Sequence, residues 1–96
     1  MNDGSARPAA ARTCEILNKR GLHARAAAKF VKLAGQFRSE VTVAKGGTTV
    51  SGLSIMGLMM LAAAPGCSVE IRAVGDDADA AVAAVAELIA GRFDEE

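Results

Sequence analysis

The chain has 96 residues, of which 51% are apolar, and its eleven basic and eleven acidic residues cancel to a formal net charge of zero. This length suits one domain and is too short for two. The sequence contains no Trp, no Tyr and no basic run, which excludes the usual nucleic-acid-binding surfaces. One His and two Cys without CxxC spacing argue against a metal site.

The N-terminal end carries no periodic pattern. Residues 1–12 mix Gly, Ser, Pro and Ala, which predicts a flexible tail before a domain over residues 13–96. They contain no continuous apolar segment of a secretory signal, and the longest apolar run, residues 55–64, is about half a membrane span. We therefore expect a cytoplasmic protein without membrane contact, in which Cys14 and Cys67 are reduced core residues.

The first predicted elements are a strand over residues 13–18, a turn at residues 19–21 and a helix over residues 24–35. Gly35 is placed to end the helix as a left-handed cap. The apolar residues at helical spacing, which predict its buried face, are Ala27, Phe30, Val31 and Ala34.

The middle of the chain predicts a hairpin and a short helix. Residues 39–45 alternate between apolar and polar, Gly46-Gly47 is a two-residue hairpin signal, and residues 48–51 return as the partner strand. A helix follows over residues 54–63 and ends before a Pro-Gly pair.

The last predicted elements are a strand over residues 67–74, with one apolar face, and a helix that begins near residue 78. Three acidic residues are placed to cap the start of this helix, namely Asp76, Asp77 and Asp79. Its predicted buried stripe consists of Ala78, Val82, Val85, Leu88 or Ile89, and Phe93.

The element order is therefore β-α-β-β-α-β-α. This order predicts an α+β fold, a two-layer open-faced β-sandwich whose four-stranded antiparallel sheet is covered on one face by three helices. The pattern leaves the order of the strands open.

The segment Gly21-Leu22-His23-Ala24-Arg25 lies where the first turn meets the first helix. His23 would stand at the helix N-terminus, where free backbone N–H groups and the helix dipole stabilise an anion such as phosphate. The neutral imidazole of a histidine is a nucleophile, and Arg25 could bind the same anion with its fork of donors. Taken alone, however, one histidine before a helix is more often a solvated surface residue.

Two longer segments resemble a known protein family and favour a functional role for this histidine. GLHARAAAKFV (residues 21–31) resembles the active-site segment of the histidine phosphocarrier proteins, the HPr family of the bacterial phosphotransferase system. SGLSIMGLMMLAAAPGCSVEI (residues 51–71) resembles the second helix and last strand of the same family. The resemblance extends from about Cys14 to Phe93.

Membership would imply that His23 is phosphorylated on Nδ1 by enzyme I, which draws on phosphoenolpyruvate, and passes the group to an enzyme IIA protein. Arg25 matches the arginine that assists the transfer, and the helix N-terminus at Ala24 and Arg25 would bind the phosphoryl group. Ala26 stands where many members have proline, which leaves the loop less rigid. The chain would be a carrier rather than an enzyme, without cofactor or metal, and a monomer.

Resemblance also implies roles for the second helix. Ser54 matches a regulatory serine that an HPr kinase phosphorylates in some bacteria, although serine is also an ordinary helix cap. The residues that fall where the family docks enzyme I are Ile55, Met56 and Met59. We expect about half of the methionines in this helix to pack into the core and the rest to form an adaptable apolar patch.

The chain resembles the nitrogen-type branch of the family, NPr, in lacking this proline and in the run SIMGLMMLAA. This resemblance favours a regulatory role over sugar import. The alternatives are a sugar-type HPr, a regulatory homologue that acts through Ser54 alone, and a ligand-binding or structural domain on a similar scaffold. Retention of His23 and Arg25 argues against the second.

Overall fold

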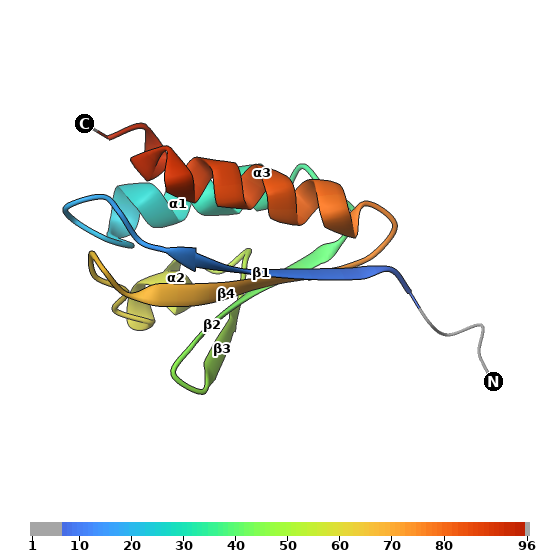
Figure 1. Cartoon of the computed structure of the whole chain (residues 1–96), viewed down its shortest axis with the longest axis horizontal. Coiled ribbons are helices and arrows are strands. Elements are labelled where there is room, and N and C mark those ends of the chain that lie inside the picture. Colours follow the sequence, from blue (N-terminus) through green and yellow to red (C-terminus); the bar gives the residue numbers. More distant parts are fainter. Residues whose placement is uncertain (1–6, 96) are drawn as a thin grey trace.

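The computed structural model describes residues 7–95 and shows the expected order of strands and helices (Figure 1). The elements are β1 (Ala9–Glu15), α1 (Ala24–Ala34), β2 (Glu40–Lys45), β3 (Thr48–Ser51), α2 (Ile55–Met60), β4 (Ser68–Val74), α3 (Ala78–Ala90) and the short 3₁₀ turn η1 (Arg92–Asp94). Within the described residues, no helix is both long and apolar enough to span a bilayer.

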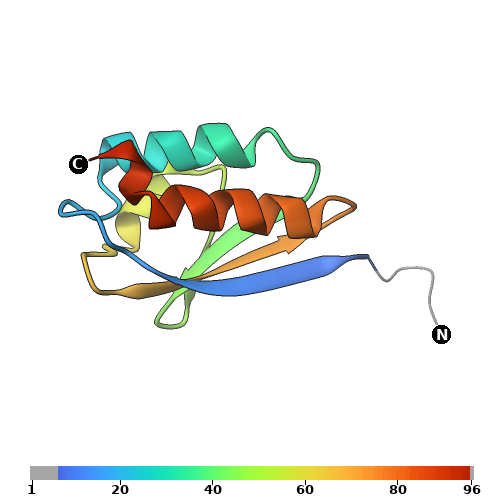
Figure 2. The same ribbon diagram turned by 45° about the horizontal axis from the view of Figure 1, so that its top comes forward.

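The four strands form one antiparallel sheet in the order β1-β4-β2-β3. The helices lie on one face of the sheet, and α1 and α3 run side by side in opposite directions (Figure 2). The predicted two-layer open sandwich is therefore confirmed. The inward side chains of β4 are buried and its outward ones are exposed, as the alternation in the sequence predicts.

Strand β1 begins at Ala9, four residues before the predicted start at Thr13. It pairs with β4 from Ala9 opposite Val74 to Glu15 opposite Ser68. The alanine-rich sequence has little strand signal of its own, and the pairing with a neighbouring strand extends it. Residues 9–12 of the predicted tail thus belong to the sheet, and residues 1–6 lie outside the described part of the chain.

The core lies between the sheet and the helices. Phe30 and Ala34 of α1 are buried as predicted, and Val31 is half-buried. In α3 the stripe includes Ile89 rather than Leu88, and Phe93 after the helix is fully buried. The two cysteines are free. Cys14 is buried, which raises the pKa of its thiol, while Cys67 is only half-buried.

The end of α1 differs from the predicted left-handed cap. Gly35 follows the helix with φ −68° and ψ −10°, a right-handed conformation. The chain continues in tighter turns, because Gln36 N–H donates to the Leu33 carbonyl at 3.0 Å and Phe37 N–H to the Ala34 carbonyl at 3.2 Å. These bonds satisfy the last carbonyls without a reversal at the glycine.

Helix α2 is shorter than predicted and places its methionines outside. It ends at Met60, and Ala62 follows with φ 53°. Leu58 is its one buried residue, whereas Met56 and Met60 are 69% and 77% exposed and Met59 is 40% exposed. The expectation that about half of these methionines enter the core was wrong, because a helix of six residues turns only one side chain inward.

Asp77 precedes α3 as predicted, but its carboxylate makes no capping bond to the helix. It accepts instead from Arg38 N–H at 2.9 Å, from Ser39 N–H at 2.8 Å and from the Ser39 hydroxyl at 2.5 Å. These bonds hold the pKa of Asp77 below its usual range, with the Ser39 hydroxyl as the largest cause. Asp77 therefore ties the start of α3 to the loop after α1.

Candidate functional site

The loop before α1 is fixed by a close backbone contact with the segment after α2. Gly21 has φ +61°, and a Cβ atom there would lie 2.2 Å from the Ala63 carbonyl oxygen. Its neighbour Leu22 donates its N–H to the same oxygen at 3.0 Å. Only glycine allows this approach without strain, so the first residue of the GLHAR segment sets the position of His23.

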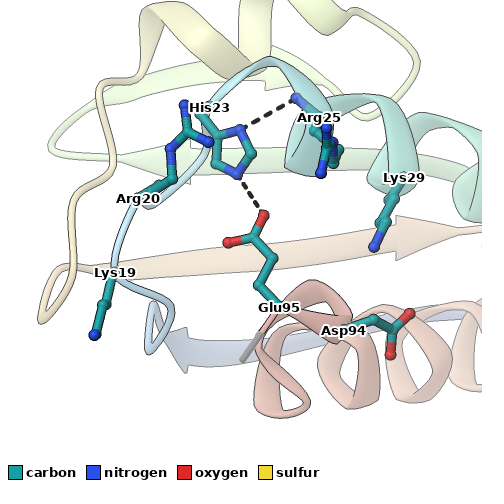
Figure 3. Close-up of a pocket in the computed structure, with 7 residues that line it drawn as sticks. All are labelled: Lys19, Arg20, His23, Arg25, Lys29, Asp94 and Glu95. Atoms are coloured by element: carbon teal, nitrogen blue, oxygen red, sulfur yellow. Dashed lines mark hydrogen bonds and ion pairs between the residues drawn. The ribbon is translucent and has the colours of Figure 1, made fainter.

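His23 is the N-cap of α1, with φ −76° and ψ 179°. Its ring nitrogen Nδ1 accepts a hydrogen bond from Arg25 N–H at 3.3 Å (Figure 3). A helix start leaves its first N–H groups without intrahelical partners, and one of them thus points at Nδ1. This assigns a lone pair to Nδ1 and places the proton of the neutral ring on Nε2.

The other side of the ring faces the C-terminal segment. Nε2 of His23 is hydrogen-bonded to Oε2 of Glu95, and both side chains are mostly shielded from solvent, at 16% and 17% exposure. The amide Nδ2 of Asn18 donates to Oε1 of Glu95 at 3.0 Å and to the Gly21 carbonyl at 2.9 Å. Asn18 therefore connects the loop, the carboxylate and, through it, the imidazole.

The pKa of Glu95 is lowered from its ordinary value. The hydrogen bond from Asn18 is the largest cause, the hydrogen bond and charge of His23 and the charge of Arg20 add to it, and partial desolvation opposes it. Glu95 is therefore an ionised acceptor near neutral pH.

A left-handed turn brings Glu95 to this place. Arg92, Phe93 and Asp94 have φ values of 59°, 55° and 61°, a conformation that costs non-glycine residues about 1–2 kcal/mol each. Burial of the Phe93 ring offsets about 1.5–3 kcal/mol of this cost. Lys29 of α1 donates from Nζ to the Phe93 carbonyl at 2.7 Å and holds the turn against the helix.

A cavity of about 370 Å³ opens beside the imidazole. Four basic residues from the loop and α1 line it, against two carboxylates from the C-terminal turn, so the lining has an excess of positive charge (Figure 3). The lining residues are Lys19, Arg20, His23, Arg25, Lys29, Asp94 and Glu95. Such a setting favours a small anion next to the ring.

A second hollow, also of about 370 Å³, shares His23 with this cavity. It is bounded by Lys19, Arg20, Leu22 and the segment from Ala62 to Pro65 that follows α2. The imidazole therefore lines both a basic cavity and a more apolar hollow, and the hollow reaches the segment that follows α2.

The structure brings together only part of the site that the sequence predicts. His23, Ala24 and Arg25 meet at the start of α1. Ser54 directly precedes α2, and Ile55, Met56 and Met59 lie on it, all outside both hollows. Ser54 caps α2, since its Oγ accepts from Gly57 N–H at 2.9 Å.

Sequence reasoning missed the contributions of Asn18, Lys29 and Glu95. Their contacts join segments as far as 77 residues apart, and no local spacing connects them. The one available signal was Phe93, because an apolar residue at the end of the buried stripe of α3 anchors the segment that carries Glu95. Among residues 7–95, no three side chains of metal-binding type gather into an ion site.

Comparisons with known proteins identify the family of this chain. A family model described as "PTS HPr component phosphorylation site" matches residues 10–91. Phosphocarrier protein HPr of Neisseria meningitidis is 54% identical over 81 residues, which cover 84% of this chain and 91% of that protein. Phosphocarrier protein NPr of Shewanella violacea is 43% identical over 84 residues, with 88% and 92% covered.

Solved structures are similar as well. HPr-C-His from Thermoanaerobacter tengcongensis superposes with a TM-score of 0.87 and 45% identity, covering 91% of this chain and 98% of that one. An HPr dimer from the same organism gives a TM-score of 0.72 and 46% identity, with 84% and 93% covered.

Proposed function

The chain belongs to the HPr family of phosphocarrier proteins of the phosphotransferase system, and on this premise we propose that His23 is its phosphoryl acceptor. His23 would take the group on Nδ1 from phosphorylated enzyme I and pass it to an enzyme IIA protein in the cytoplasm. The observation that carries the proposal is the lone pair of Nδ1 at a helix N-terminus, next to a cavity with four basic side chains.

The basic groups would stabilise the charge that moves. A phosphoryl group on Nδ1 would take the place of the lone pair that now accepts from Arg25 N–H, so this N–H is free to donate to a phosphoryl oxygen. The guanidinium of Arg25 lines the same cavity and can bind two oxygens at once. The chain supplies position and charge, and the donor and acceptor proteins supply the rest of the catalysis.

We propose the exposed face of α2 as the docking surface for enzyme I. Ile55, Met56 and Met59 are exposed, and the segment after α2 borders one of the hollows beside His23. Flexible methionines adapt to more than one partner. Met56→Ser should raise the KM of phosphorylation by enzyme I several-fold and leave stability within about 0.5 kcal/mol.

Ser54 is proposed as a regulatory phosphorylation site for an HPr kinase. A phosphoserine adds roughly −1.5 to −2 charges within the apolar docking surface, so docking of enzyme I would weaken more than the fold. Ser54→Asp should reproduce the weaker docking, whereas Ser54→Ala should lose only the cap to Gly57. A role through Ser54 alone would leave the cavity at His23 unused.

Phosphotransfer tests the main proposal. The protein is incubated with enzyme I and radiolabelled phosphoenolpyruvate, and label that is labile in acid and stable in alkali marks a phosphohistidine. His23→Ala should abolish the label, and Arg25→Ala should slow its appearance. Label that persists in His23→Ala would refute the assignment.

Two further points of the proposal have direct tests. We propose a nitrogen-type acceptor, which the Ala26 substitution and the methionine-rich run support. Faster transfer from the labelled protein to a nitrogen-type IIA than to a sugar-type IIA would agree with this proposal, and the reverse would favour the sugar-type role.

We also propose that the protein is a monomer. Sedimentation velocity measures its mass in solution, and the mass of a dimer would contradict the proposal.

A further inference from the structure

Glu95 lies 72 residues from His23 in the chain and is its hydrogen-bond partner in the fold (Figure 3). We propose that Glu95 is a positioning residue: its carboxylate, oriented by Asn18, keeps the ring proton of His23 on Nε2 and leaves Nδ1 free to bond phosphorus. This inference rests on the proposed function of His23, although the position of the proton can be measured without phosphotransfer.

The amide of Asn18 can be placed in only one way. Its Nδ2 faces two acceptors, the Gly21 carbonyl and Oε1 of Glu95, so a flipped amide would turn its oxygen toward two oxygens. Its own Oδ1 is buried and has no hydrogen-bond partner in the described part of the chain. A buried acceptor without a partner costs free energy. The amide of Asn18 keeps its orientation despite this cost, which indicates that the two hydrogen bonds of Nδ2 determine it.

The orientation of Asn18 requires an acceptor at Oε1 of Glu95, and a proton on Nε2 of His23 requires an acceptor at Oε2. One carboxylate oxygen accepts from Asn18 and the other from Nε2–H of His23. A glutamine side chain in this place cannot do both, because one of its two terminal positions is an NH₂ donor. With its oxygen toward Asn18, the glutamine would direct its NH₂ group at Nε2, which selects the tautomer with the proton on Nδ1.

Two contacts at Phe93 anchor the turn that carries Glu95. Phe93 is fully buried two residues before Glu95, and Lys29 donates to the Phe93 carbonyl. The other carboxylate of the turn, Asp94, points away from the imidazole in Figure 3. Glu95 thus reaches the ring from an anchored turn rather than from a freely moving chain end.

The proposed role of Glu95 agrees with the movement of electron pairs and protons during phosphoryl transfer. The lone pair of Nδ1 forms the N–P bond while the bond from phosphorus to the donor breaks, and the electron pair of that bond stays on the donor. The ring then carries a positive charge, with its proton still on Nε2 opposite the Glu95 carboxylate. On transfer to the acceptor the N–P electron pair returns to Nδ1, so no proton has to leave the ring.

The experiment measures the tautomer directly. The ¹⁵N shifts of the His23 ring are recorded by NMR over a pH series, and the spectra of the neutral ring are compared for the wild type, Glu95→Gln and Asp94→Asn. We expect the Nε2–H form to dominate in the wild type and the Nδ1–H fraction to rise at least about threefold in Glu95→Gln. Asp94→Asn is the matched control, since it removes the same charge one residue earlier and should keep the wild-type tautomer.

Phosphorylation by enzyme I supplies the second readout. In Glu95→Gln, kcat should fall about tenfold while KM stays within about twofold, because the ring changes and the docking surface does not. A wild-type ring in the Nδ1–H form, or a Glu95→Gln ring with the wild-type tautomer, would overturn the proposal. If the tautomers behave as expected but wild-type His23 takes no label, the proposed function fails and the contact with Glu95 stands.

Discussion

A carboxylate joins α3 to the neighbourhood of α1 at each end of the helical layer, and the two contacts differ in kind. At the start of α3, Asp77 accepts from two backbone N–H groups and the Ser39 hydroxyl. Beyond the end of α3, Glu95 accepts from Asn18 and the imidazole of His23. The pKa of each carboxyl is lowered by its donors.

The difference lies in what the donors can do. Backbone N–H groups and a hydroxyl keep their protons at physiological pH, so the contact at Asp77 can only stabilise the fold. The imidazole has two protonation states and two tautomers and lies beside a basic cavity. The same kind of bond therefore contributes stability at one end of the layer and controls chemistry at the other.

The largest effect is expected from removing the anchor of the C-terminal turn. Phe93→Ala leaves a cavity in the core and should lower the free energy of unfolding by about 3–5 kcal/mol. It should also release Glu95, so that the ¹⁵N spectrum of His23 shows both tautomers. Phe93→Leu should cost less in urea unfolding and keep the wild-type tautomer. Equal spectra for the alanine and leucine variants would show that the turn needs no anchor.

A steric change in the loop before His23 should have the next largest effect. Gly21→Ala combines φ +61° with a contact of 2.2 Å to the Ala63 carbonyl, and should cost at least about 2 kcal/mol in urea unfolding. Gly46→Ala is the control, because Gly46 has φ +55° and open space where a Cβ atom would lie. Its cost should be only about 1 kcal/mol. Similar costs for both variants would contradict the close contact.

Removal of the charge of Asp77 should change the stability of the fold and leave the rate of His23 phosphorylation unchanged. Because the pKa of Asp77 is lower in the folded than in the unfolded chain, its stabilisation is present above the unfolded pKa and is lost as the pH falls through the folded pKa. Asp77→Asn should therefore be less stable than the wild type near neutral pH, and the difference should shrink in acid.

Two measurements complete the test at Asp77. Asp76→Asn, which changes an exposed neighbour, should follow the wild-type stability across the pH range. The rate of His23 phosphorylation should be unchanged in Asp77→Asn. A slower rate would mean that the two ends of the helical layer are coupled and that the contact at Asp77 affects more than stability.

The smallest effect is expected at Lys29. Lys29→Gln removes the hydrogen bond from Nζ to the Phe93 carbonyl and should cost about 1 kcal/mol. Lys32→Gln, at an exposed position of the same helix, should change stability by less than about 0.5 kcal/mol. Thermal unfolding of the two variants measures the difference, and equal melting temperatures would show that the turn is held by Phe93 alone.

Sequence patterns predicted most of the elements. Alternation and helical spacing report which face of a segment is apolar, and they found all four strands and the three helices with errors mainly at the ends. The error at β1 came from pairing with β4, which turned an alanine-rich segment into a strand. The error at Gly35 came from continuing turns that satisfied the helix end.

The candidate site was predicted in part for the same reason. His23 and Arg25 lie in one short segment, so helix geometry alone places them together. The methionines of α2 were misplaced, since their spacing does not say how few residues the helix can turn toward the core. Asp77 was predicted at the right helix start, but its partners lie on another loop.

By itself, the sequence determined the alternation of strands and helices and the histidine at the start of α1, because each depends on neighbours within a few residues. Only the tertiary structure decided the strand order, the meeting of the C-terminal turn with the basic side chains around His23, and the pairing of Glu95 with His23. These features require residues from opposite ends of the chain to meet. That meeting is set by how the layers pack, and local periodicity carries no information about it.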